Sequence, residues 1–145
     1  LRVRVLHGTA HLREELEAAV GGERDRRRGF EAMGAAYVRF AVTHPSHYRV
    51  MFGGFVEACR NEPELAQEAG ASFQVLVDAI ASRQRDGLLH GDDPEQMARY
   101  VWAIVHGIAM LAIDGQLRGR DTDAEVRYAI ERLGSGILRT GVSST

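Results

Sequence analysis

Hydrophobic side chains recur every three or four residues along most of the chain, which is the spacing of amphipathic helices. The clearest stripe, expected on a helix from about residue 24 to 43, consists of Phe30, Met33, Tyr37, Phe40 and Ala41. Comparable stripes predict helices over about 11–20, 47–55, 63–85, 94–117 and from 122 past 137. The pattern therefore predicts an all-α protein, a bundle of five or six helices.

Proline and capping residues mark where the predicted helices begin. Pro45, Pro63 and Pro94 can each occupy a first helical turn, where the absent N–H would have had no partner. The segment 122–125 (TDAE) has the form of a capping box, and Thr9 is expected to cap the helix at 11–20.

The length of 145 residues corresponds to one domain, which we expect over residues 9–140. Residues Leu1 to Val5 alternate like a strand, but no second strand is predicted to pair with them. We therefore expect residues 1–8 to be a tail or a truncated junction, and the polar residues 141–145 to be a flexible tail.

The segment from Tyr100 to Ile113 is apolar nearly all round and is interrupted only by His106. Spanning a bilayer takes about 20 apolar residues, so this shorter segment is predicted to be a core helix covered on more than one side. We expect a soluble protein with no membrane partner.

Composition excludes several kinds of site. The 18 basic residues, all arginine, and 20 acidic residues give a net charge of −2, which argues against a nucleic-acid-binding surface on this chain. The single cysteine, Cys59, excludes an intrachain disulfide and a cysteine-based zinc site. The absence of lysine is typical of a GC-rich bacterial genome.

His106 is the polar residue that most needs an explanation. It is either a polar group in a ligand cavity or a core histidine bonded to a neighbour, and the sequence leaves both open. A metal would require a second ligand one turn away, but those positions hold Trp102, Ala103, Ala109 and Met110. No nucleophile elbow or phosphate-binding glycine loop occurs, so we predict no metal, cofactor or catalytic residue, and no enzyme.

Aromatic residues from four predicted helices share the inward stripes. Spacing alone favours an ordinary aromatic core, but helical bundles of this size also hold ligands between their helices. The aromatic residues are Tyr37, Phe40, Tyr48, Phe52, Phe55, Phe73, Tyr100 and Trp102.

Two stretches decide between these readings. AYVRFAVTHPSHYRVMF (36–52) and YVWAIVHGIAMLAIDG (100–115) resemble the C-terminal domain of TetR-family transcriptional repressors. They are most similar to a subgroup marked by a tryptophan and a His-Gly pair in the penultimate helix, here Trp102, His106 and Gly107. The resemblance covers roughly residues 9–140.

The resemblance implies a cavity for a small, mostly apolar effector, lined by Tyr37, Phe40, Phe52, Phe55, Phe73, Tyr100, Trp102 and His106. It also implies a homodimer formed through the last two helices, through Ile113, Leu117, Val126, Ile130, Leu133 and Ile137. Gly134 and Gly136 in the last helix are consistent with close approach of another backbone.

The resemblance further implies that effector binding releases operator DNA from an N-terminal helix-turn-helix domain. Residues 1–8 contain no such domain, so no DNA-binding residue is predicted in this chain. The function expected is therefore the effector-sensing and dimerisation domain of a cytoplasmic, bacterial TetR-like repressor. The alternatives are a stand-alone helical protein that binds small molecules without a DNA function and, less favoured, a helical enzyme that uses His106.

Overall fold

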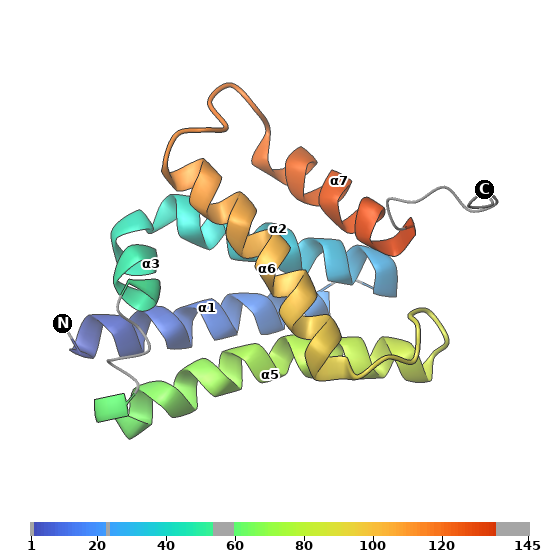
Figure 1. Cartoon of the computed structure of the whole chain (residues 1–145), viewed down its shortest axis with the longest axis horizontal. Coiled ribbons are helices and arrows are strands. Elements are labelled where there is room, and N and C mark those ends of the chain that lie inside the picture. The colour runs from blue at the N-terminus through green and yellow to red at the C-terminus, as the bar shows by residue number, and fades with distance from the viewer. Residues whose placement is uncertain (1, 23, 54–59, 136–145) are drawn as a thin grey trace, which may run out of the picture.

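The computed structural model describes residues 2–22, 24–53 and 60–135 of the chain. In these residues no strand occurs, and the all-α prediction is confirmed. The helices are α1 (Arg2–Gly22), α2 (Arg26–Thr43), α3 (Pro45–Phe52), α5 (Pro63–Arg85), α6 (Pro94–Ile113) and α7 (Thr122–Ser135) (Figure 1).

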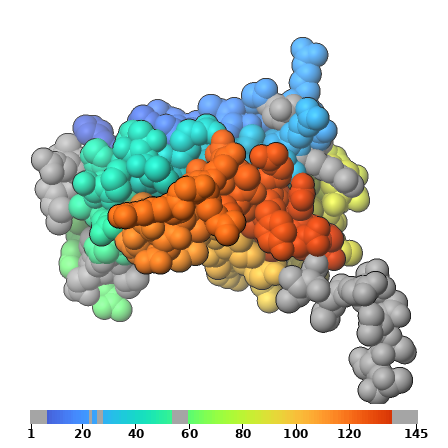
Figure 2. Space-filling view, turned by 90° about the horizontal axis from the view of Figure 1, so that it is seen from above, coloured from blue at the N-terminus to red at the C-terminus, as the bar shows by residue number. Residues whose placement is uncertain are grey.

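Helices α1 and α5 lie side by side, and α2 and α6 cover this pair, crossing each other (Figure 1). Helix α3 packs on α1 and α2 at one end of the molecule. Helix α7 packs on α2 and α6 from the side away from α1, so that α7 and part of α6 form an outer surface (Figure 2).

The predicted prolines do begin their helices, because α3, α5 and α6 start at Pro45, Pro63 and Pro94. The Asp93 side chain caps α6 by accepting a hydrogen bond from the Gln96 backbone N–H at 2.9 Å. These signals act locally, between residues adjacent in sequence, and sequence therefore reveals them well.

Helix α1 differs from the expected tail and short helix. Its backbone is already helical at Arg2, and Thr9 is buried inside the helix rather than capping it. A Cβ atom on Gly8 would lie 3.1 Å from the Met51 sulfur, so this part of α1 packs tightly on α3. Helix α1 as a whole contacts α2, α3 and α5, and its backbone is helical although residues 1–5 alternate like a strand. The tail expected at 141–145 lies outside the described residues.

The ends of the last two helices also differ from expectation. Helix α6 ends at Ile113 instead of Leu117, because Gly115 adopts a φ of 74° and turns the backbone, with Gln116 N–H bonded to the Leu111 carbonyl at 2.9 Å. At the start of α7 the capping side chain is Asp121 rather than Thr122, since its carboxylate accepts from the Asp123 N–H at 3.0 Å.

The core is tightest where α2 meets α6 and α7. Val38 and Ala41 of α2 are completely buried, and a Cβ atom on Gly34 would lie only 3.0 Å from Val126 of α7. Val126 and Ile130 are 1% and 8% exposed and belong to this core. A glycine in α2 therefore lets α7 approach closely, and the inner side of α7 is covered within the same protomer.

Helix α6 packs against three other helices, but one strip of its apolar surface stays uncovered. The residues that face the core are Ala98, Val101, Val105 and Ala109. On the outside, Tyr100 is 60% and Leu111 47% exposed. By length and composition alone α6 could cross a membrane, but here it packs against α2, α5 and α7.

Candidate ligand-binding cavity

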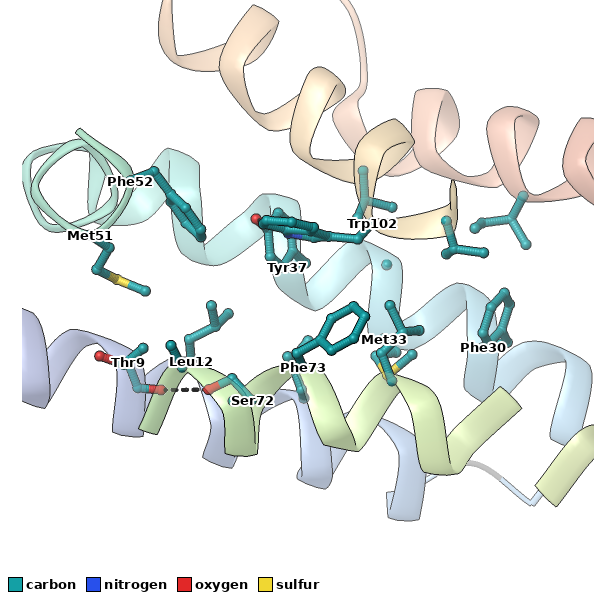
Figure 3. Close-up of a pocket in the computed structure, with 18 of the residues that line it drawn as sticks. Thr9, Leu12, Phe30, Met33, Tyr37, Met51, Phe52, Ser72, Phe73 and Trp102 are labelled. Atoms are coloured by element: carbon teal, nitrogen blue, oxygen red, sulfur yellow. Dashed lines mark hydrogen bonds between the residues drawn. The ribbon is translucent and has the colours of Figure 1, made fainter. Parts of the chain in front are cut away.

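A cavity of about 370 Å³ lies inside the bundle, with α1 and α5 on one side and α2 and α6 on the other (Figure 3). Met51 and Phe52 of α3 lie at one end, and Phe30 lies at the other (Figure 3). The remaining lining residues are Thr9, Leu12, Leu16, Met33, Gly34, Tyr37, Ala66, Ala69, Gly70, Ser72, Phe73, Leu76, Val101, Trp102, Val105 and Ile130. This volume is in the range of cavities that hold small organic ligands.

The volume arises from the distribution of large and small side chains. Phe30, Met33 and Tyr37 follow one another at three and four residues on α2 and present a bulky wall. Opposite them, α5 contributes the small residues Ala69 and Gly70. Because small side chains fill little of the space between helices, this side of the cavity is recessed.

The wall is almost entirely apolar. No charged side chain is among the described residues that line the cavity. Ser72 is turned to the backbone, because its hydroxyl lies 3.3 Å from the Thr9 carbonyl and 3.1 Å from the Glu68 carbonyl. The cavity can therefore accept a neutral, mostly apolar molecule and offers nothing to neutralise a charged one.

Behind one part of the wall lies a polar cluster, formed by Trp102, Tyr37, Tyr48 and His106. Trp102 Nε1–H donates to the Tyr37 hydroxyl at 3.0 Å. The Tyr37 hydroxyl lies 2.9 Å from the Tyr48 hydroxyl and 3.0 Å from His106 Nδ1. The Tyr48 hydroxyl is also hydrogen-bonded to His106 Nδ1. The cluster thereby joins α2, α3 and α6 through side-chain hydrogen bonds.

Burial keeps the polar cluster uncharged at neutral pH. It raises the pKa of Tyr37 to about 12 and raises the pKa of Tyr48 well above its usual range, so both hydroxyls remain protonated. It also lowers the pKa of His106, which makes the neutral imidazole the dominant form at pH 7.

The structure brings together about half of the residues expected at the ligand site. Tyr37, Phe52, Phe73 and Trp102 line the cavity. His106 lies behind Tyr37 in the polar cluster and is not in the wall itself. This arrangement combines the two interpretations that the sequence left open for His106.

Two expected residues lie elsewhere, and a third is not described. Phe40 is 2% exposed and stacks on His44 with ring centroids 5.1 Å apart, away from the cavity. Tyr100 does not point inward: it is 60% exposed, because the neighbouring Val101 takes the inward position on α6. Phe55 lies outside the described residues.

Sequence reasoning missed other lining residues, among them Leu12, Leu16 and Met51. It also did not assign Tyr48 to the site, although the aromatic pattern included it. Tyr48 and His106 are 58 residues apart, so only the tertiary fold brings them together. The small residues of α5 were the one local sign of a recessed wall.

The predicted dimer residues are distributed between core and surface. Val126 and Ile130 lie in the protomer's own core, and Ile113, Leu117 and Leu133 are half-buried. Ile137 is outside the described residues. A search of the described residues finds no group of three or more His, Cys, Asp or Glu side chains that could hold a metal ion.

Comparison with known proteins identifies the family. Residues 30–133 match the family described as "Tetracyclin repressor-like, C-terminal domain". The chain is 27% identical over 124 residues to the uncharacterised HTH-type transcriptional regulator Rv0681 of Mycobacterium tuberculosis, covering 83% of this chain but only 52% of that regulator. It therefore spans about half the length of this relative.

A solved structure agrees with this assignment. A protein of unknown function from Rhodococcus sp. RHA1 superimposes with a TM-score of 0.85 at 29% sequence identity, over 94% of this chain and 71% of that one. The resemblance seen in the two sequence stretches is confirmed, and the chain belongs to the family of tetracycline-repressor-like C-terminal domains.

Proposed function

We propose that this chain is the effector-sensing and dimerisation domain of a cytoplasmic TetR-like transcriptional repressor. A small, mostly apolar effector binds in the cavity, and its binding releases operator DNA. The observation that carries this proposal is the cavity of about 370 Å³ between the helices, which has no charged residue among its described lining. Membership of a family of regulator domains supports the regulatory role.

DNA contact is assigned to a part of the whole protein beyond this chain. The Mycobacterium tuberculosis relative is named as an HTH-type regulator, and this chain matches 52% of its length. The net charge of −2 is consistent with a domain that senses a ligand and does not itself neutralise phosphates.

The lining favours an effector with one or two rings or a short branched hydrocarbon. Met33 and Met51 have flexible, polarisable side chains that adapt to irregular ligands. Phe73 and Trp102 offer aromatic rings, which contact each other edge to face with centroids 6.2 Å apart. A charged group within the cavity would lose its hydration without gaining a partner of opposite charge.

Ligand binding can be tested with the neutral fluorescent probe N-phenyl-1-naphthylamine. Trp102 is the chain's only tryptophan and lines the cavity, so a probe bound there should quench its emission by energy transfer. We expect saturation at one probe per chain. At a free probe concentration of about 100 times Kd, the free energy of unfolding should rise by about 2.7 kcal/mol. Binding that never saturates, or that leaves stability unchanged, would contradict a ligand-binding role.

The outer side of α6 supports the proposed homodimer. Tyr100, Ala103, Gly107 and Leu111 follow one another at three and four residues and form one strip, in which Gly107 is half-buried and the other three are exposed. Tyr128 of α7 is also exposed, at 63%. A Cβ atom on Gly107 would meet no other atom within 4 Å. An apolar strip with a glycine at its centre suits close approach of a second copy, which would cover α6 on its remaining side.

A pair of leucine substitutions tests this surface. Leu111→Glu places a charge in the strip and should convert a dimer, about twice the 16.0 kDa chain mass, into a monomer. Leu88→Glu is the control for adding a charge at an exposed leucine, since Leu88 is 40% exposed in the turn after α5, beside the Tyr100 end of the strip, and should disturb the dimer much less than Leu111→Glu. Sedimentation equilibrium measures both. A wild-type monomer, or an L111E variant that remains dimeric, would overturn the proposed interface.

A further inference from the structure

The hydrogen atoms of the polar cluster can be assigned by counting donors and acceptors. Trp102 supplies one N–H, and each tyrosine hydroxyl supplies one O–H. One complete arrangement has Trp102 donating to Tyr37, Tyr37 donating to Tyr48, and Tyr48 donating to His106 Nδ1. A second has both Trp102 and Tyr48 donating to Tyr37, which itself donates to Nδ1 at 3.0 Å. Both arrangements require Nδ1 to be an unprotonated acceptor, so they assign the hydrogen of the neutral imidazole to Nε2.

A proton on Nδ1 changes this count. The imidazole then donates to the Tyr48 hydroxyl, which donates in turn to Tyr37. The Tyr37 oxygen now accepts from both Trp102 and Tyr48, so its own hydrogen has no acceptor left within the cluster. Because Tyr37 also lines the cavity, this O–H becomes available to an acceptor atom inside it.

Among the described residues, no other titratable group faces the His106 imidazole and could take up the proton in its place. The titratable groups that face the His106 imidazole are the hydroxyls of Tyr37 from α2 and Tyr48 from α3, and both stay protonated in neutral and acidic solution. Phe52 covers the imidazole at 4.8 Å between ring centroids. No ion pair in the described residues includes His106, and the nearby charges Arg49 and Asp114 pair with each other at 2.7 Å.

Among the other polar lining residues, Ser72 is bonded to backbone carbonyls and Thr9 has a partner of its own. Tyr37 is therefore the wall residue through which protonation can change the polarity of the cavity.

We propose that Tyr37 and His106 determine which ligands the cavity accepts. While His106 is neutral, the cavity binds neutral hydrocarbon ligands. A ligand with one hydrogen-bond acceptor binds only when Nδ1 of His106 also takes up one proton. This inference rests on the proposed ligand-binding function and specifies its chemistry. A ketone or ether oxygen that accepts from Tyr37 stabilises the protonated cluster, so by linkage the proton must also strengthen binding of that ligand.

The test uses two uncharged probes of nearly equal shape, 2-isopropylnaphthalene and 2-acetylnaphthalene, in which a methyl group is replaced by a carbonyl oxygen. Each displaces N-phenyl-1-naphthylamine from the protein at pH 5 to 8, with circular dichroism confirming the folded state at each pH. The hydrocarbon should bind equally well throughout. Binding of the ketone should strengthen by up to about tenfold per pH unit as the pH falls from 8, and should level off once the pH is below the lowered pKa of His106 in the free protein.

Two variants locate the effect. In His106→Phe the three donor hydrogens have only two acceptors, so one hydroxyl hydrogen is free at every pH, and preference for the ketone should be raised and independent of pH. Tyr48→Phe leaves Tyr37 3.0 Å from Nδ1, and the pH dependence should persist.

The outcomes distinguish failure of ligand binding from failure of the proton linkage. If neither probe displaces the dye from the wild type, the cavity is not a ligand site and the proposed function fails. If both probes bind with a ratio that does not change with pH, ligand binding stands and the proton linkage is overturned. The wild-type series decides this even if His106→Phe does not fold.

Discussion

Helix α2 is packed in two very different ways. Against α7, a single added methyl group on Gly34 would come within 3.0 Å of Val126. Towards α1 and α5, the same helix faces a cavity of about 370 Å³ through Met33 and Tyr37. Between Gly34 and Val126 an added carbon atom fits only if Val126 shifts, whereas beside Met33 and Tyr37 there is room for a small molecule.

Protein interiors are normally close-packed, with few voids larger than a water molecule. Atoms that line an empty space lose dispersion contacts, so a void of this size opposes folding unless a ligand fills it. The close contacts of α2 with α6 and α7 therefore contribute to stability. The contacts that are missing beside the cavity lower stability unless a ligand fills the space. Substitutions of equal size should have opposite consequences on the two sides.

The largest effect is expected at the tight side. Gly34→Leu should lower the free energy of unfolding by about 2–3 kcal/mol, because the new side chain collides with Val126, Val105 and Ile130. This loss exceeds the gain of up to about 1 kcal/mol that replacement of a mid-helix glycine brings. Urea denaturation of the wild type and the variant measures the difference.

Gly70→Leu on α5 provides the matched control. A Cβ atom at Gly70 meets no atom within 4 Å, and the residue is exposed, so the same substitution should raise stability by about 0.5–1 kcal/mol. If both variants lose stability equally, Gly34 and Gly70 do not differ in the free space around them as described.

The sequence predicted the helices well because their signals are local. Hydrophobic periodicity and the prolines at positions 45, 63 and 94 act between neighbouring residues, and they place the helix starts directly. The prediction of an N-terminal tail at residues 1–8 was wrong because five alternating residues indicate little about conformation. Helix α1, which includes them from Arg2, is stabilised by tertiary contacts with α2, α3 and α5.

Which face of each helix points to the core was much harder to predict. Helix α6 is apolar all round, so its pattern cannot tell Val101, which faces the core, from Tyr100, which faces outward. In the same way the stripe on α7 was assigned to a second copy, but Val126 and Ile130 are covered by α2 of the same protomer. Only the relative positions of α2, α6 and α7 resolve this, and those depend on a glycine 92 residues away from Val126 in sequence.

The cavity itself is not a property of any one segment. Its residues come from α1, α2, α3, α5, α6 and α7, and each of them is also a normal core residue by its type. The sequence could name aromatic candidates, of which Tyr37, Phe52, Phe73 and Trp102 line the cavity. It could not show that the space between them is left open.

The smallest effect on stability is expected where the space is open. Phe73→Trp adds volume beside Trp102, whose ring centroid lies 6.2 Å from that of Phe73, and the cavity should absorb it with a change in unfolding free energy of less than about 1 kcal/mol. Binding of N-phenyl-1-naphthylamine, followed by its own emission, should weaken at least about tenfold because the added ring occupies the ligand's space.

Phe40→Trp makes the same chemical change in a packed part of the core. Phe40 is 2% exposed, stacks on His44 and does not line the cavity, so overpacking should lower stability by about 1–3 kcal/mol while probe affinity is retained in the folded protein. The two variants should therefore show opposite patterns of stability and affinity. A Phe73→Trp protein that loses as much stability as Phe40→Trp would mean that Phe73 is packed as an ordinary core residue, and that the space seen beside it does not exist in solution.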